Sequence, residues 1–349
     1  MPFTAEQLAI GANYALAEYD RKEPIDQINI KHKTLDWLIR HKKEASFTNG
    51  TFKEPVYIDN NSNAQNYFGA DQVTYNERDP ARWTDFKYYN VHDGFWFDED
   101  RLIAAGIHLT DERDAVPTAG DKEVLINLLE QSYRGLKLGM QEHLAFETLR
   151  DGSQSSKAAP GLSHLISTTP SVGVVGGISA VDFTFWRNNI NLGINPTSDD
   201  VIAEFEDTWR ANQLYGGTVP DFIPMGSVMY DAFRDAANTA VSRYITNGGN
   251  TRGGVSVDPG TNDITFHGVP VVWDPTFDAL DALLSTTNWG KTALFLNSNK
   301  VNLRPVKREW MRSRKPEKLP DRYVVYFGRT AKYGLTTNQR NALSILTLA

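Results

Sequence analysis

The residues that could carry out chemistry in this chain are dispersed, and their spacing matches no catalytic motif. Histidines occur far apart, at positions that include His32, His41, His143, His164 and His267. A hydrolase triad needs a serine activated by a histidine and an acid, but Ser153 and Ser227 lie outside any G-x-S-x-G turn. The 43 Asp and Glu residues are so frequent that a glycosidase-like carboxylate pair could be chosen anywhere. We therefore predict no catalytic residue and no enzyme.

Ligand-binding motifs are incomplete in the same way. His92-Asp93 and Asp98-Glu99-Asp100 supply metal-ligand side chains without any HxH, HxxxH or calcium-loop spacing. The glycine-rich stretch at residues 172–178 follows neither the GxGxxG nor the GxxxxGKS/T order, and no helix is expected to open after it. We therefore predict no metal, no nucleotide and no other cofactor.

Composition narrows the class of protein further. The chain has 349 residues, of which 40% are hydrophobic and 23% charged, which is typical of one large or two ordinary globular domains. No apolar run reaches the roughly 20 residues that span a membrane, and the N-terminus lacks a signal-peptide core, so we expect no membrane partner. The absence of cysteine excludes disulfides and fits a reducing compartment. The net charge of -7 argues against non-specific nucleic-acid binding by the whole surface.

The element around which the chain is organised is a long helix predicted over residues 121–151. Apolar residues recur at helical spacing on one stripe, at Leu125, Leu129, Leu136, Met140 and Leu144. Asp121 is the predicted N-cap and Gly152 the predicted C-terminal stop. About thirty residues at 1.5 Å each make a rod of roughly 45 Å. Gly135 and Gly139 are the positions where such a rod could bend.

A basic arm and a long hairpin precede this helix. A short helix is expected from Thr4 to about Tyr19. The basic residues 29–43 form either an arm that reaches a neighbour or an ordinary surface helix, and both interpretations stay open. A strand around residues 52–58 and a returning strand at residues 71–75 enclose a polar tip, followed by a second reversal at residues 76–82. Because a long hairpin with so few apolar residues at its tip is not stable alone, it needs a surface from its own domain or from another subunit.

The chain after the long helix alternates helices and strands. Helices are expected at residues 198–214, capped by Ser198, and at residues 227–244. Strands are expected at residues 255–257, 264–272, 292–296, 323–327 and 332–348. A basic stretch from Arg304 to Arg322 contains Trp310 and could contact either phosphate backbone or another subunit. The middle third therefore looks like an α/β lobe of its own.

This order of elements resembles the major capsid proteins of tailed bacteriophages, which have the Hong Kong 97-type fold. The matching stretches are LRDG at residues 149–152 followed by PGL at 160–162, GGI at 176–178 with FWRN at 185–188, and HGVPV at 267–271 with WDP at 273–275 and LFLN at 294–297. The resemblance covers most of the chain and depends on architecture more than on any single residue.

The resemblance implies an α+β Hong Kong 97-like capsid fold and a division of the chain. It implies an N-terminal arm at residues 1–45, an E-loop hairpin at 46–92 and a peripheral domain at 93–160 that carries the spine helix at 121–151. An axial α/β domain would follow at residues 161–299, and residues 300–349 would supply C-terminal strands. Some relatives join subunits by a Lys–Asn bond on the E-loop, but Lys53 and Lys87 lie near its ends, so we expect no crosslink.

The implied function is structural. Copies of the chain would form the hexamers and pentamers of an icosahedral shell that encloses double-stranded DNA, assembled in the host cytoplasm and found in the virion head. No long charged coiled coil is present at the start, so a separate scaffolding protein is expected, together with a portal and a decoration or cement protein. The candidate inter-subunit contacts are Asn60, Asn61, Asn63, Gln65, Asn66, Trp83, Arg304, Lys307, Arg308 and Trp310.

Two other functions stay open at this point. The first is an encapsulin-like compartment, which would have the same fold and enclose a protein cargo. The second belongs to a different class, a β-rich glycan-binding or glycan-active protein that uses exposed tryptophans such as Trp83 and Trp96. Shells and monomers are easily told apart by electron microscopy.

Overall fold

The structure is a computed structural model that describes most of the chain, and the chain divides into two compact units. The described residues are 30–45, 50–57, 62–77, 80–98, 119–215, 218–242, 251–252, 255–257, 264–285, 289–314, 317–318 and 324–349. Unit 1 contains Met1–Ile30, Asn90–Leu144 and Arg308–Lys332, and unit 2 contains Lys31–Tyr89, Ala145–Lys307 and Tyr333–Ala349. The short helix predicted from Thr4 to about Tyr19 lies outside the described residues.

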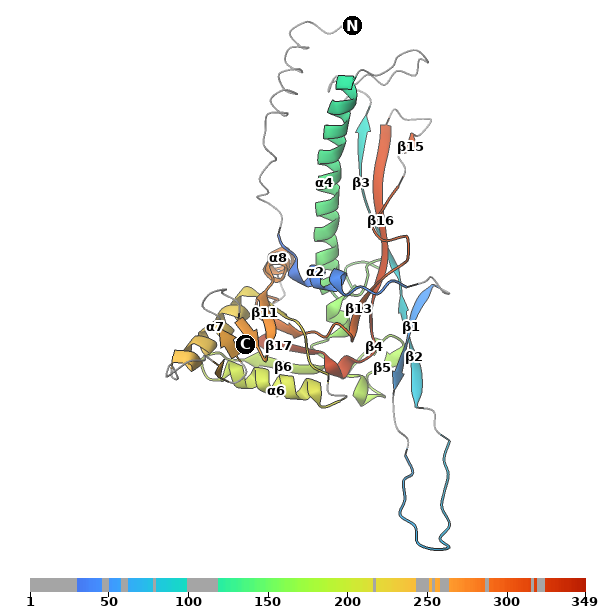
Figure 1. The fold of residues 1–349 in the computed structure, drawn as a ribbon, viewed down its shortest axis with the longest axis vertical. Coiled ribbons are helices and arrows are strands. Elements are labelled where there is room, and N and C mark those ends of the chain that lie inside the picture. The colour runs from blue at the N-terminus through green and yellow to red at the C-terminus, as the bar shows by residue number, and fades with distance from the viewer. Residues whose placement is uncertain are drawn as a thin grey trace. The chain divides into compact units, whose positions relative to one another are not determined.

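Unit 1 is built on the predicted long helix. Helix α4 (Ala119–Leu149) begins two residues before Asp121, so Asp121 lies inside the first turn and is not the N-cap. The helix runs beside strands β3 (Tyr89–Asp98) and β16 (Val324–Thr337), with which the short strands β14 (Arg312–Ser313) and β15 (Glu317–Lys318) are associated (Figure 1). Phe95 of β3 stacks on Phe327 of β16 with ring centroids 5.1 Å apart, and Tyr133 of α4 meets Phe95 edge-on at 5.3 Å. This aromatic contact joins the helix to one face of the sheet.

Unit 2 contains an eight-stranded mixed sheet in the order β6-β17-β12-β7-β11-β10-β9-β8. Its strands are β6 (Asn189–Ile194), β7 (Ile223–Met225), β8 (Thr251–Arg252), β9 (Val255–Val257), β10 (Ile264–Phe266), β11 (Val269–Trp273), β12 (Thr292–Phe295) and β17 (Ser344–Leu348). Helices α6 (Val201–Gln213) and α7 (Ser227–Ser242) pack on this sheet, and the fully buried rings of Phe205, Phe233, Phe266 and Phe295 fill the layer between. The middle third of the chain thus alternates helices and strands, and its sheet also takes β17 from the C-terminal end of the chain.

The smaller elements of unit 2 lie around this sheet and at its links to the rest of the chain. They are α2 (Lys33–Arg40), α5 (Leu162–Leu165), α8 (Pro275–Leu284), β13 (Val301–Pro305) and the short strands β4 (Val174–Val175) and β5 (Ile178–Ser179). Strand β13 pairs with the last part of β16, and residues 43–45 run along it through bonds from the Lys43 amide to the Leu303 carbonyl, 3.0 Å, and from the Ala45 amide to the Pro305 carbonyl, 3.1 Å.

Three predictions about local structure were wrong. Helix α6 is capped by Asp200, whose carboxylate accepts bonds from the amides of Ile202 and Ala203, and not by Ser198. No helix was predicted between the strands at residues 264–272 and 292–296, but α8 lies there, with Pro275 at its first position, where proline is favourable. Residues 332–348 are not one strand, since β16 ends at Thr337 and a short 3-10 turn precedes β17.

The predicted hairpin is present, but its returning strand lies later in the sequence than residues 71–75, where it was predicted. Strand β1 (Thr51–Tyr57) pairs with β2 (Ala81–Lys87), in a register that runs from Thr51 opposite Lys87 to Tyr57 opposite Ala81. Residues 71–77 are irregular. The 81–87 segment was taken partly for a turn, whereas it turns Thr84 and Phe86 inward to match the buried residues of β1.

The glycine-rich stretch serves as a turn that packs against this hairpin. Gly176 and Gly177 connect β4 and β5 with φ values of 59° and 78°. The Gly176 carbonyl accepts a bond of 2.9 Å from the Asp85 amide, and a Cβ on Gly176 would lie 2.7 Å from the Phe86 ring. The glycines therefore allow close backbone approach and have a packing role.

Candidate inter-subunit surfaces

The C-terminal end of α4 is fixed by backbone and buried polar contacts within unit 2. Gly152 has φ 90°, and the Gly161 amide donates 2.8 Å to the Arg150 carbonyl, which would otherwise lack a helical partner. A Cβ on Gly161 would collide with the carbonyl oxygens of Glu147, Thr148 and Arg150. The PGL stretch is therefore a helix stop in which only glycine fits.

Two buried ionisable groups hold this region together. The Glu147 carboxylate accepts bonds from the Tyr333 hydroxyl, 2.5 Å, and the Ala159 amide, 2.8 Å. Burial, followed by the charge of Glu147, raises the pKa of Tyr333 well above its usual value. Arg340 is almost fully buried and donates to the carbonyls of Leu165 and Trp186, each at 2.8 Å. Burial lowers the pKa of Arg340 to about 10. These buried hydrogen bonds stabilise the fold.

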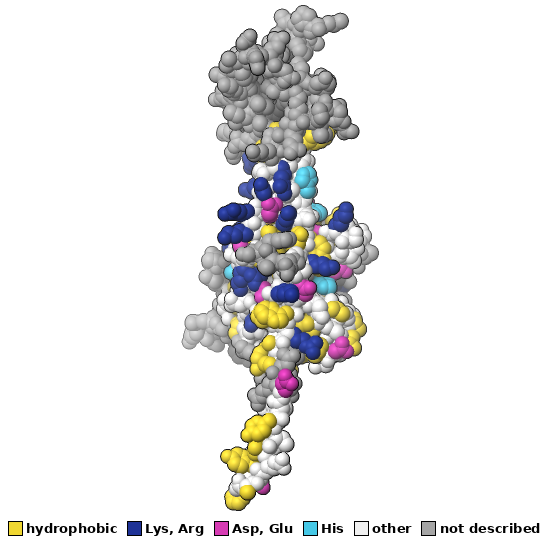
Figure 2. All heavy atoms as spheres, turned by 90° about the vertical axis from the view of Figure 1, so that its right-hand side faces the viewer, with side chains coloured by type: hydrophobic (Ala, Val, Ile, Leu, Met, Phe, Trp, Pro, Cys, Tyr) yellow, Lys and Arg dark blue, Asp and Glu magenta, His cyan; other side chains and the backbone are white. Residues whose placement is uncertain are grey.

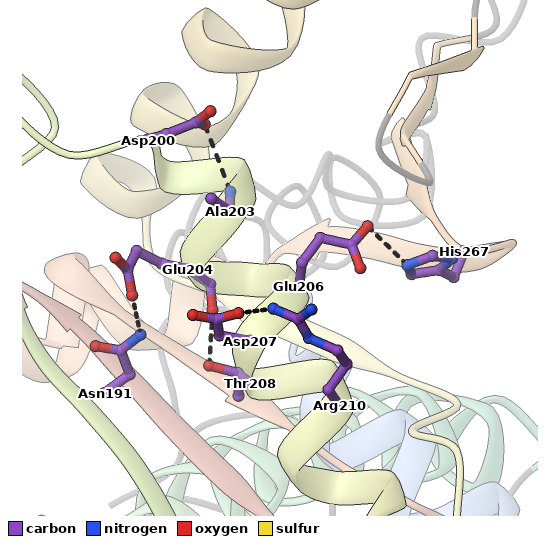
Figure 3. A network of polar contacts seen from close by, with 9 residues as sticks. All are labelled: Asn191, Asp200, Ala203, Glu204, Glu206, Asp207, Thr208, Arg210 and His267. Carbon is purple, nitrogen blue, oxygen red and sulfur yellow. Dashed lines mark hydrogen bonds and ion pairs between the residues drawn. The ribbon is translucent and has the colours of Figure 1, made fainter.

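The polar contacts on the surface of α6 also lack a common centre. Along α6, Glu204 accepts from Asn191, Glu206 pairs with His267 at 2.9 Å, and Asp207 pairs with Arg210 (Figure 3). Each pair points in its own direction along the helix. Within the part of the chain that the structure describes, no group of three His, Asp or Glu side chains could hold a metal ion. Among the same residues, no helix is both long enough and apolar enough to cross a membrane.

The predicted contact residues at the hairpin have different surroundings. Asn60 and Asn61 lie outside the described residues. Asn63 donates to the Thr74 carbonyl at 2.5 Å and Gln65 donates to the Thr74 hydroxyl at 3.3 Å, so both brace the loop across its own width. Asn66 is exposed, and Trp83 exposes 65% of its surface on the outer side of β2. Among the described residues of this set, Asn66 and Trp83 therefore present their side chains outward, and Gln65 is exposed while it bonds to its own loop.

The predicted contact residues near the C-terminal end also differ from one another in their surroundings. Arg304 forms an ion pair with Glu54 of β1 and donates to Thr336, so its charge is largely used inside unit 2. Lys307 and Arg308 are exposed, Arg308 with φ 67°, and Trp310 is half-buried. Inter-subunit roles for these residues stay predictions.

Exposed aromatic residues on the hairpin loop were missed by the sequence reasoning. The loop was predicted to be polar at its tip, yet Tyr67, Phe68 and Tyr75 are among the most exposed large side chains described. Hydrophobic side chains accordingly stand out along the loop (Figure 2). The signal that could have found them is the adjacent Tyr-Phe pair inside an otherwise polar run.

A basic face lies on the sheet of unit 1. Since Phe327 and Phe95 pack on the α4 side, strand alternation places Thr330, Lys332 and Trp96 on the opposite, second face. Arg312 lies opposite Thr330 in the β14–β16 register, and Arg314 donates 3.0 Å to the Thr330 hydroxyl, so both extend this face.

Glu309 is the carboxylate that these basic residues share. It pairs with Arg312, Arg314 and Lys332. The hydrogen bond from Arg312, followed by the charges around it, holds the pKa of Glu309 below its usual value. The Glu309 carboxylate therefore offsets part of the positive charge of Arg312, Arg314 and Lys332.

Comparison with solved structures shows where this architecture is found. The chain aligns over 95% of its length with 97% of a chain in the cyanophage A-1(L) capsid asymmetric unit, with a TM-score of 0.56 and 14% identity. A second match, to a chain from Mycobacterium phage Bobi, covers 96% of this chain and 97% of that chain, with a TM-score of 0.53 and 13% identity. For the capsid of Myoviridae phage XM1 the values are 95% of this chain and 98% of that one, a TM-score of 0.52 and 11% identity.

No protein-family model matches the chain, and no curated protein matches it in sequence. The similarity is therefore one of the arrangement of helices and strands. It extends over nearly all of this chain and of each capsid chain compared. The chain has the fold of these phage capsid proteins, the Hong Kong 97-type fold.

Proposed function

We propose that this chain is a major capsid protein that assembles into the hexamers and pentamers of an icosahedral shell around double-stranded DNA. The observation that carries the proposal is the two-way coverage of the structural match, 95% of this chain and 97% of the cyanophage capsid chain. The fold thus accounts for almost every residue of this sequence. The role proposed is structural, with no catalytic step.

The hairpin supports this proposal from its own physics. The base of the hairpin is the β1–β2 ladder, which is bonded to the β4–β5 turn of unit 2. Its loop keeps three large aromatic side chains in solvent. Exposed apolar groups of this size mark surfaces that are covered in an assembly. Head-to-tail contacts between identical copies, in which one surface meets a different one, close into rings such as hexamers and pentamers.

The surface charge suits a container for DNA. The chain carries a net charge of -7, so on balance it repels phosphate groups, and packaged DNA can slide during filling.

We propose that the assembled protein is located in the virion head after assembly in the host cytoplasm. Its further partners would be a separate scaffolding protein, a portal and a decoration or cement protein.

The long helix supplies a means of changing shape in such a shell. Gly135 and Gly139 lie in the interior of α4, where glycine weakens a helix by about 1 kcal/mol relative to alanine. A Cβ at Gly135 would meet no atom within 4 Å, so no packing constraint explains the choice of glycine there. We propose that these two residues are the bending points of the helix when the shell expands.

Electron microscopy of the purified protein tests the proposed function. Polyhedral shells, or hexameric and pentameric rings, are expected, and their mass should be a multiple of the 39.1 kDa chain. A protein that remains monomeric at micromolar concentration with and without a co-expressed scaffold would overturn the proposal. Shells that contain a protein cargo, together with an absence of DNA packaging, would assign it instead to an encapsulin-like compartment.

A further inference from the structure

A strip of positive charge runs along helix α2 and the turn that leads into β13. Residues 31–44 carry five cationic side chains against two carboxylates, Asp36 and Glu44, in a chain whose net charge is -7. Together with one lysine of the turn, the cations form a set that we call the α2 strip: Lys31, Lys33, Arg40, Lys42, Lys43 and Lys300. Within the described part of the chain, none of these side chains forms an ion pair.

The backbone brings two lysines of the strip to the same place. The Lys43 amide donates 3.0 Å to the Leu303 carbonyl of β13, and the Lys300 amide donates 3.0 Å to the Asn297 carbonyl within the turn before that strand. Lys300 is half-buried and Lys43 is exposed. Burial, followed by the positive charge of Lys43, lowers the pKa of Lys300. Two ammonium groups therefore share one site without a carboxylate partner among the described residues, which costs free energy on folding.

Helix stability accounts for only part of the strip. Arg40 lies in the last turn of α2, where the helix dipole favours a cation, but Lys33 occupies the first position, where the dipole disfavours one. The helix buries Leu35, Trp37 and Leu38 against unit 2, so Lys33 and Arg40 lie on its solvent side. Charges that folding does not favour are typical of a functional surface.

We propose that the α2 strip binds the phosphate backbone of double-stranded DNA, with Lys43 and Lys300 holding one phosphate between them. This inference rests on the proposed function and names the surface of the subunit that would meet the packaged DNA. A phosphate between the two ammonium groups supplies the counter-charge that both lack. Such contacts are independent of base sequence and weaken with salt, so they position DNA without fixing its register.

The composition of the strip favours a nucleic acid over an acidic protein. A protein interface has an apolar core that is rich in aromatic side chains. Among the described residues, none of the exposed large hydrophobic side chains falls within residues 31–45 or 297–301. Five of the six cations are lysines, which are flexible point charges without the fork geometry that suits a carboxylate. The strip therefore offers charge alone, which is sufficient for a phosphate backbone.

Binding of a short fluorescent DNA duplex of arbitrary sequence, followed by anisotropy on the full unassembled chain, tests the site. The double variant Lys43→Gln, Lys300→Gln should bind roughly tenfold more weakly at low salt, and the slope of log K against log salt should fall by about 1, because one phosphate contact is lost. Lys43→Arg, Lys300→Arg keeps both charges and should bind as the unsubstituted chain does. Urea unfolding should show the glutamine variant to be no less stable, since a like-charge contact is removed.

The matched control is Lys53→Gln, Lys157→Gln, which removes the same charge from two exposed lysines of unit 2 outside the strip and should leave binding unchanged. Assembled particles give a second readout, by acylation with a small amine-reactive reagent and mass spectrometry. Lys43 and Lys300 should react less in DNA-filled shells than in empty shells, whereas Lys157 should react equally in both.

Three outcomes would overturn the inference while shells still form and the proposed function stands. They are an equal loss of DNA binding in the two glutamine variants, equal reactivity of Lys43 and Lys300 in filled and empty shells, and tighter binding of polyglutamate than of DNA. The last outcome would assign the strip to an acidic protein partner. If the unsubstituted chain forms no shell, the proposed function fails, and the anisotropy measurement still decides whether the strip binds DNA.

Discussion

The carboxylate of Asp274 accepts hydrogen bonds from both the backbone amide of Thr34, 2.7 Å, and its hydroxyl, 2.5 Å, although the two residues are 240 positions apart. The same carboxylate accepts from the amide of Thr276, 3.0 Å, and from its hydroxyl, 2.6 Å. Asp274 is the N-cap of α8, and Thr34 lies in the first turn of α2. One buried carboxylate therefore serves the positive ends of two helices and ties α2, which lies within the predicted N-terminal arm, to the body of unit 2.

Replacing Asp274 by alanine should destabilise the protein more than the loss of an ordinary cap. Two caps at about 1 kcal/mol each are lost, and buried donors are left without a partner, so the free energy of unfolding should fall by about 2 to 4 kcal/mol. Urea unfolding measures the change. Hydrogen exchange of the α2 amides should also accelerate before global unfolding, since α2 loses its tether.

The matched control is Asp200→Ala at the start of α6. Asp200 caps one helix only, through the amides of Ile202 and Ala203. Its loss should cost about 1 kcal/mol and should leave exchange of the α2 amides unchanged. Equal effects of the two substitutions would contradict the double-cap role of Asp274.

The ion pair between Glu54 and Arg304 gives a second prediction about unit 2. It joins β1 at the base of the hairpin to β13, and Thr336 donates to the same carboxylate at 3.2 Å. Because Glu54 is nearly buried, Glu54→Gln leaves the guanidinium of Arg304 without its counter-charge and should cost about 3 kcal/mol in unfolding free energy.

A double-mutant cycle separates pairing from burial at this site. Replacing both Glu54 and Arg304 by methionine removes both charges, and it should recover most of the stability lost in Glu54→Gln. Additive losses, as measured by urea unfolding, would show that Arg304 is stabilised elsewhere. They would also return Arg304 to the residues available for contact with a second copy.

The long helix and the lobe were predictable because their signals are local and repeated. The apolar stripe through Leu136, Met140 and Leu144 recurs at the helical period, and all three side chains are buried. The β2 strand was missed because residues 71–75 alternate as a strand does, while the actual register is decided by Phe86 and Phe52, whose segments are distant in sequence. Local pattern does not contain that information.

The surface residues were predicted least well, because exposure depends on contacts between distant segments. The sequence placed Arg304 in a basic surface stretch. In the structure its guanidinium forms an ion pair with Glu54, 250 positions earlier, and is partly buried. Asn63 and Gln65 looked outward on composition and in fact brace their own loop. The aromatic tip was hidden by its polar neighbours in the sequence, and only the path of the loop shows that nothing of its own chain covers Phe68.

His164 should make stability depend on pH. Burial, followed by the positive charge of Arg340, lowers its pKa from the model-peptide value of 6.5. A lowered pKa means that the unfolded chain binds a proton more readily, so the folded state loses stability as pH falls through about 6.5 and below. Urea unfolding at pH 7.5 and 5.5 should therefore show a smaller difference for His164→Gln than for the unsubstituted chain. An identical difference in both proteins would contradict this role.

The glycines of α4 allow a test of bending that does not disturb packing. Alanine fits at Gly135, where no atom lies within 4 Å of the new Cβ, and at Gly139, where the nearest atom is an Asp93 carboxylate oxygen at 3.6 Å. The double variant should gain up to about 1 kcal/mol per site in helix stability. Shells should still form, since the added methyl groups collide with no neighbouring atom. Their expansion should be slower, because a stiffer helix resists bending.

The measurement is the particle diameter over time by cryo-electron microscopy under conditions that trigger expansion. Gly161→Ala is the contrasting variant, because its Cβ would collide with the carbonyls of Glu147, Thr148 and Arg150, and the protein should fail to fold. If the Gly135→Ala, Gly139→Ala variant gains the expected stability and expands at the unsubstituted rate, then bending of α4 at these positions does not limit expansion. The glycines would then need another explanation, such as a close approach of a second copy to this face of the helix.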